Sequence, residues 1–146
     1  MLKSDSKFHL DCGDAVIHGE IVGDGSSILL IHGWPLDRRV FSLQIAQLSQ
    51  HFTVISYDRR GFGESSGEPD LRRELDDINR LLDSYTDQTV HLLGMSQGAR
   101  VALRYCVKHS DRLRSLILQG AVIDGVTIPE SVEEKIPVSD YAELVQ

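Results

Sequence analysis

The chain has 146 residues, of which 41% are hydrophobic and 25% are charged, a balance typical of one soluble globular domain. Its formal net charge of −7 argues against binding to nucleic acid or to an anionic membrane surface. The cysteines, Cys12 and Cys106, are too far apart for a metal or redox motif. The N-terminal residues lack the apolar stretch of a secretory signal, and no apolar run is long enough to cross a bilayer. We therefore expect a cytoplasmic protein.

Strand-like and helix-like segments alternate along the chain. Strands are predicted over 8–10, 16–22, 28–31, 52–57, 90–95 and 113–118, and helices over 38–50, 71–85 and 97–108. This alternation predicts an α/β fold with a mostly parallel sheet and helices on both faces. The first two strands are too close for a helical crossover, so we expect an antiparallel hairpin at one edge. The core is expected to span 1–125, followed by a tail or the start of a cap region over 126–146.

A G-x-S-x-G pattern formed by Gly94, Ser96 and Gly98 lies between a predicted strand and a predicted helix. In that setting the serine occupies a strained turn, and the glycines remove side chains that would collide with the neighbouring backbone. Its hydroxyl would then be exposed near a helix N-terminus, where negative charge is stabilised. A serine that merely caps the helix is the alternative. The complete strand, turn and helix favour Ser96 as a nucleophile.

The segment from His32 to Pro35, His-Gly-Trp-Pro, follows the third predicted strand. An acyl-transfer enzyme of this architecture places its oxyanion loop there. The backbone amides of Trp34 and Gln97 would both point at an oxyanion on a substrate attached to Ser96. Trp34 could instead be a packing aromatic beside a turn. Both roles are compatible, because the oxyanion role belongs to the amide and not to the ring.

Three segments together resemble successive signatures of the α/β-hydrolase family, over about residues 7–125: ILLIHGWP at 28–35, SYDRRGFGES at 56–65 and GMSQG at 94–98. The segment at 111–118 resembles the family's sixth strand. Members with a similar HGxP loop include epoxide hydrolases and haloalkane dehalogenases, but those carry an aspartate at the nucleophile position. Ser96 implies the serine branch, which comprises esterases, lactonases, cofactor-free haloperoxidases and C–C bond hydrolases. The resemblance implies a small ester-like substrate and neither a metal nor an organic cofactor.

The glycine-rich loop at 61–67 has the spacing G-x-G-x-x-x-G, which does not match a dinucleotide fingerprint, and no Walker lysine accompanies it. A dinucleotide-binding oxidoreductase shares the α/β class but is not supported by this spacing. In the resembling family, Asp58 and these glycines shape the turn after the fourth strand.

A complete triad is not expected in this chain. The acid and then the histidine follow the nucleophile in hydrolases of this fold, and His109 is the histidine that follows Ser96. It comes 13 residues later, which on a helix is roughly 18–20 Å away. His32 is expected to support the oxyanion loop. By resemblance, Asp124 is the best-placed acid, although family members usually carry it where Gln119 stands here.

Two functions from different classes stay open. The first is a serine hydrolase whose remaining triad residues come from a longer protein or another chain. The second is a catalytically silent fragment or pseudoenzyme that binds a ligand or partner. The family's sheet has further strands after this point, so the strand at 113–118 would present unpaired backbone groups at an apolar edge. An oligomer or a second chain could cover that edge.

Overall fold

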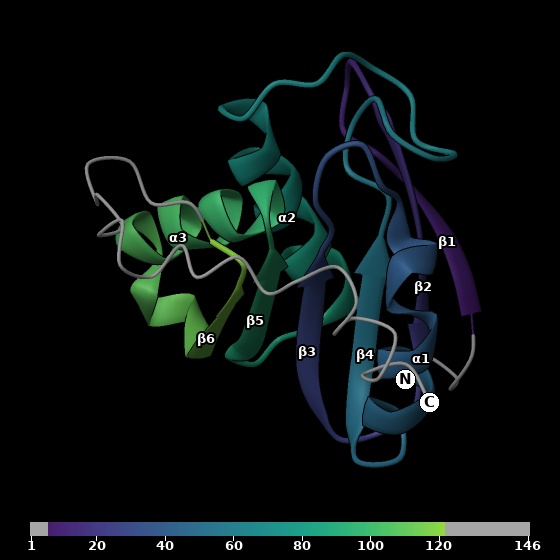
Figure 1. Cartoon of the computed structure of the whole chain (residues 1–146), viewed down its shortest axis with the longest axis vertical. Coiled ribbons are helices and arrows are strands. Elements are labelled where there is room, and N and C mark those ends of the chain that lie inside the picture. Colours follow the sequence, from purple (N-terminus) through teal and green to yellow (C-terminus); the bar gives the residue numbers. More distant parts are fainter. Residues whose placement is uncertain (1–5, 122–146) are drawn as a thin grey trace, which may run out of the picture.

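The computed structural model describes residues 6–121. Its six strands form one sheet in the order β1-β2-β4-β3-β5-β6, which can be followed from right to left in Figure 1. Strands β4, β3, β5 and β6 are parallel, whereas β1 and β2 form an antiparallel hairpin at one edge. The predicted mostly parallel sheet is thus confirmed. The strands are β1 (Ser6–Asp11), β2 (Val16–Val22), β3 (Ser26–Ile31), β4 (Phe52–Tyr57), β5 (Val90–Met95) and β6 (Leu113–Gln119).

The three predicted helices occur, although the one expected over 71–85 begins two residues later than expected, a short 3₁₀ turn at 110–112 was not predicted, and the first helix is divided. The helix expected over 38–50 is divided into a 3₁₀ turn, η1 (Arg38–Phe41), and a short helix, α1 (Ser42–Leu48). Asp37 starts the turn by accepting a hydrogen bond from the Arg39 amide, and the Phe41 backbone leaves helical geometry while its ring enters the core. The other helical segments are α2 (Arg73–Tyr85), α3 (Gln97–Lys108) and η2 (Ser110–Arg112).

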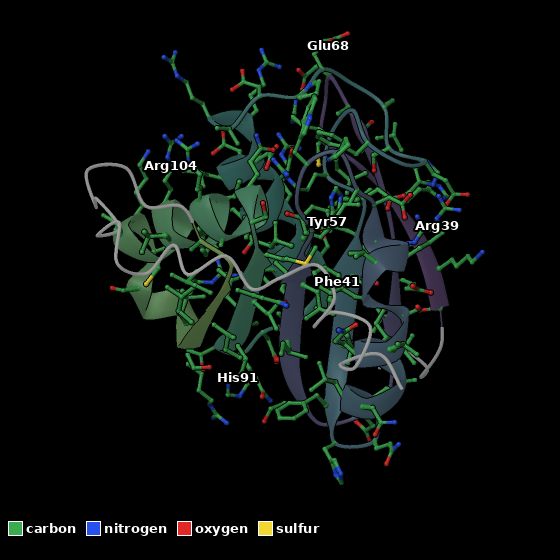
Figure 2. The ribbon with its side chains drawn as sticks, in the orientation of Figure 1. Arg39, Phe41, Tyr57, Glu68, His91 and Arg104 are labelled. Atoms are coloured by element: carbon green, nitrogen blue, oxygen red, sulfur yellow. The ribbon has the colours of Figure 1, made fainter. Side chains whose placement is uncertain are left out.

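Helices cover both faces of the sheet. Leu29 and Ile31 of β3 join a core cluster with residues of α2 and α3, whereas Ile28 and Leu30 join a second cluster with η1 and α1. The alternation of side chains along β3 therefore supplies both cores, which explains why the strand is apolar without interruption. Figure 2 shows Phe41 and Tyr57 in the interior, and Arg39 and Arg104 at the outside of the molecule.

The two edge strands differ from the central ones. Side chains of β1 alternate between partly buried and exposed, as expected of a strand with one solvent face. Within the described residues, β6 pairs only with β5. No helix in this part of the chain is long and apolar enough to cross a membrane. The domain boundary expected at residue 125 lies outside the described residues.

The connections after β3, β4 and β5 leave from the same edge of the sheet, because these three strands are parallel and adjacent. The chain turns from β3 to β4 on one side and later returns to β5 on the other. Crevices at the carboxyl ends of parallel strands, where the chain direction changes in this way, are the usual location of α/β binding sites. His32, Asp58 and Ser96 are the first residues after these strands.

Candidate active site

Ser96 occupies the turn between β5 and α3 in a strained conformation. Its backbone angles are φ 54° and ψ −118°. Among the described residues, Ser96 is the only non-glycine residue with a positive φ. The Ser96 amide donates to the Gln119 carbonyl at 2.8 Å, and the Ser96 carbonyl accepts from the Ala99 amide at 3.0 Å. These bonds hold the backbone in place while the side chain is exposed. Such strain persists only where the surrounding structure enforces it, and it clusters at functional sites.

The two flanking glycines allow the helix to approach the sheet closely. A Cβ atom on Gly94 would lie 2.4 Å from the Gly98 carbonyl oxygen. One on Gly98 would lie 2.3 Å from the Ile31 carbonyl oxygen and 2.5 Å from that of His32. The neighbouring atoms belong to the backbone, so they cannot rotate away. The first turn of α3 thus packs directly against the ends of β3 and β5.

The loop after β3 lies against the serine. A Cβ atom on Gly33 would be 3.0 Å from Ser96 Cβ and 3.6 Å from Ser96 Oγ. The loop turns sharply there, because the Leu36 amide donates to the Gly33 carbonyl at 3.1 Å, and the Trp34–Pro35 peptide bond is cis. Trp34 is 58% exposed. Glycine at position 33 is what permits this approach.

The amides expected to hold an oxyanion are placed beside this turn. Within residues 6–121, neither the Trp34 nor the Gln97 amide donates a hydrogen bond to a protein group. For Gln97 the reason is its position as the first residue of α3, because N–H groups of the first helical turn have no intrahelical acceptor. The positive end of the helix dipole also lies there. This edge of the sheet can therefore accommodate an anion.

His32 is fully buried beneath the loop, and both ring nitrogens are engaged. Nε2 accepts a hydrogen bond from the Arg59 amide at 3.0 Å, so Nδ1 carries the proton that it donates to the Gly33 carbonyl at 2.9 Å. Burial lowers the pKa of His32, although the bond to Gly33 opposes this effect. A neutral imidazole with both ring nitrogens in hydrogen bonds has no free lone pair to accept the proton of Ser96.

Buried ion pairs surround the loop after β4. Asp58 accepts from the Arg38 and Glu64 amides at 2.8 and 2.9 Å and also forms an ion pair with the Arg38 guanidinium. Arg59 donates two hydrogen bonds to the Glu74 carboxylate, both at 2.9 Å. Arg60 donates two to the Asp77 carboxylate, at 2.7 and 2.8 Å. Burial raises the pKa of Glu74, and the Arg59 guanidinium opposes this effect. These pairs were not anticipated from the sequence.

The structure does not bring a histidine of the described residues to Ser96. His109 ends α3, where its ring stacks on Tyr105 at 4.7 Å between centroids, so it cannot reach the turn at the other end of that helix. Within residues 6–121, no side chain forms a hydrogen bond with Ser96 Oγ. Asp124, the expected acid, lies outside the described residues. In the same part of the chain, no three His, Cys, Asp or Glu side chains gather as metal ligands.

A mostly parallel sheet with a strained serine at its carboxyl edge and a glycine loop packed against it defines an α/β protein of the hydrolase type. The family model described as the alpha/beta hydrolase fold matches residues 27–143. The chain belongs to the alpha/beta hydrolase family.

Curated relatives and solved structures in this family carry several activities. The chain is 32% identical over 133 residues to a fluoroacetate dehalogenase of Burkholderia sp, covering 86% of this chain and 42% of that protein. It is 33% identical over 103 residues to a pimeloyl-[acyl-carrier protein] methyl ester esterase of Proteus mirabilis, covering 69% and 39%. The structure of an esterase from Exiguobacterium antarcticum superimposes with a TM-score of 0.68 at 33% identity, covering 73% and 42%. The chain spans about 40% of the length of the curated relatives that it matches.

Proposed function

We propose that the chain carries the nucleophile half of a serine hydrolase that acts on ester-type carbonyl substrates. Ser96 Oγ forms a bond to the carbonyl carbon and gives its proton to a base, while the Trp34 and Gln97 amides stabilise the oxyanion. The tetrahedral intermediate collapses, the alcohol leaves with a proton, and the acyl group stays on Ser96. Water then attacks the acyl-serine and releases the acid.

One observation carries this proposal: the backbone strain at Ser96 coincides with the close approach of Gly33 to its side chain. A serine that only capped a helix would need neither, because an N-cap residue normally has an extended conformation and its side-chain oxygen accepts a hydrogen bond from a backbone N–H of the first turn. Ser96 makes no such capping hydrogen bond through its side chain.

The nucleophile type favours carbonyl chemistry over dehalogenation, although one relative is a dehalogenase. Displacement of a halide by a serine hydroxyl would leave an ether on the protein, which water does not readily cleave. An acyl-serine has a carbonyl that water can attack, so the enzyme is regenerated. The esterase relatives are consistent with this chemistry.

We further propose that the general base comes from polypeptide outside residues 6–121, because His32 is engaged and His109 is remote from Ser96. Asp124 is the candidate acid. A longer protein or a second chain that extends the sheet from the β6 edge could place a base beside Ser96, since β6 adjoins β5 and its Gln119 carbonyl contacts the serine amide.

Ester hydrolysis by the full chain tests the proposal. We would measure release of an aryl alcohol from an activated aryl ester by the wild type, by Ser96→Ala and by a control, Ser84→Ala, at an exposed serine of α2. With imidazole added as the base that residues 6–121 do not supply, the wild type and the control should exceed the rate of the same buffer equally, and Ser96→Ala should fall to that rate. Equal activity in Ser96→Ala would place the chemistry elsewhere.

The second candidate is a catalytically silent ligand- or partner-binding protein. The lack of a hydrogen-bonding base at Ser96 within the described residues favours it. Removal of a triad base costs on the order of 10⁶ in turnover, and the oxyanion site leaves a small residual rate. No hydrolysis above the buffer rate by folded wild-type protein would support this candidate.

A further inference from the structure

Arg59 connects helix α2 with the loop that contacts Ser96. Its Nε and Nη2 donate to the Glu74 carboxylate at 2.9 Å each. On the other side, Nη1 donates to the His32 carbonyl at 3.2 Å, and the Arg59 amide donates to His32 Nε2 at 3.0 Å. The side chains of Arg59 and Glu74 are each only 1% exposed. The guanidinium is thereby fixed by a carboxylate at one end and holds the start of the loop at the other.

Aromatic contacts extend the same connection to Trp34. The Arg59 guanidinium carbon lies 5.2 Å from the centre of the Phe62 ring. The Phe62 ring meets His32 edge-on at 5.5 Å and Trp34 edge-on at 5.1 Å between centroids. Arg59 is therefore linked directly to His32 and through Phe62 to Trp34, the residues on either side of Gly33. A Cβ atom added to Gly33 would lie 3.0 Å from Ser96 Cβ.

The neighbouring ion pair is built in the same way but bonds to a different part of the molecule. Arg60 makes two hydrogen bonds to Asp77, and both side chains are 2% exposed. Its remaining contact is with Asp14, in the turn between β1 and β2, at 3.2 Å. Among the described residues, no hydrogen bond or ion pair joins this pair to the loop after β3. The comparison separates the effect of losing a buried ion pair from the effect of losing the Arg59 connection.

We propose that Glu74, acting through Arg59, is a positioning residue that sets the place of the Gly33–Trp34 peptide relative to Ser96. The consequence for catalysis rests on the proposed function, whereas the structural connection does not. Glu74 fixes the Arg59 guanidinium. The guanidinium and the backbone amide of Arg59 hold His32, and the Phe62 ring restricts the motion of the Trp34 ring. An oxyanion donor must be held firmly, because a misplacement of about 1 Å can cost on the order of 10²-fold in rate.

Trp34 allows a direct test, because it is the single tryptophan of the chain. We would compare the fluorescence anisotropy and the near-ultraviolet circular dichroism of Trp34 in the full-length wild type, Glu74→Gln and the matched control Asp77→Asn. Glu74→Gln should lower the anisotropy and weaken the tryptophan dichroism, while Asp77→Asn should leave both at the wild-type level. Equal spectra for Glu74→Gln and wild type, or equal changes in both variants, would overturn the proposal.

A second variant guards against a failure of Glu74→Gln to fold. Phe62→Leu removes the ring between the guanidinium and Trp34 without a change of charge, and it should alter the Trp34 signals in the same direction. Glu74→Asp, which keeps the carboxylate, should restore part of the wild-type signal. Unchanged Trp34 signals in Phe62→Leu would also contradict the connection.

Reaction of the same variants with a fluorophosphonate separates this proposal from the proposed function. Loosening of one oxyanion donor should slow adduct formation at Ser96 by about tenfold or more, less than the 10²–10³-fold typical for loss of a donor. The Asp77→Asn control should react at the wild-type rate. If Ser96 is not a nucleophile, no variant forms the adduct, but the Trp34 signals still respond. If only the positioning role is wrong, all variants react alike.

Discussion

Substitution of Gly98 by alanine should destabilise the protein, although alanine is normally the better residue in a helix. At an ordinary helical position, glycine to alanine gains up to about 1 kcal/mol. Here the new Cβ would lie 2.3 Å from the Ile31 carbonyl oxygen and 2.5 Å from that of His32. Both are backbone atoms, so α3 must move away from β3. We expect a loss at or above the upper end of the about 1–3 kcal/mol typical of overpacking.

A matched control isolates the steric origin of this loss. Gly13 has a φ of 89°, but a Cβ atom there would have open space around it. Gly13→Ala should therefore cost only the backbone term, about 1–2 kcal/mol. Urea unfolding gives the free energies from the transition midpoints and slopes. A Gly98→Ala protein as stable as the wild type, or more stable, would refute the close packing of α3 on the carboxyl end of β3.

Three further predictions follow from strain, burial and charge. Ser96→Gly should stabilise the protein by about 1–2 kcal/mol in urea unfolding, because it relieves the positive φ, whereas Ser96→Ala should not. Burial lowers the pKa of His32 below 6.5, so its contribution is present above the unfolded value and lost as pH falls through the folded one; His32→Gln should flatten the fall in urea midpoint below about pH 6.5. Asp77→Asn, which leaves Arg60 with only its half-exposed partner Asp14, should cost about 3 kcal/mol, the lower end for breaking a buried ion pair. Asp14→Asn should cost at most about 1 kcal/mol by the same unfolding assay.

The fold could be predicted because its signal is local. The uninterrupted apolar run of β3 indicates a strand covered on both faces, and the spacing of Leu75, Ile78 and Leu82 indicates one face of α2. The division of the helix at 38–48 could not be predicted, because it depends on where Phe41 meets the sheet. Periodicity records which residues are apolar and not the angle at which a chain enters its core.

The turn at Ser96 was predictable in part for the same reason. The glycines at 94 and 98 indicate close backbone contacts, and the structure places backbone atoms where their Cβ atoms would be. The Arg59–Glu74 and Arg60–Asp77 pairs were not anticipated, because pairing across the fold leaves no periodic signal. One clue was available: Glu74 and Asp77 lie three residues apart beside the apolar positions of α2, the helix that follows the loop begun by Arg59 and Arg60 after a buried strand.

Selective covalent labelling of Ser96 in the full chain tests the central claim most directly. A fluorophosphonate would be reacted with wild type and Ser96→Ala, and the adduct located by intact mass and peptide mapping. The strained turn and the free amides should make Ser96 react faster than exposed serines such as Ser84 and Ser110, even without a complete triad. The account predicts a single adduct on Ser96 that disappears in Ser96→Ala. No adduct on folded protein, or labelling spread equally over the exposed serines, would contradict it.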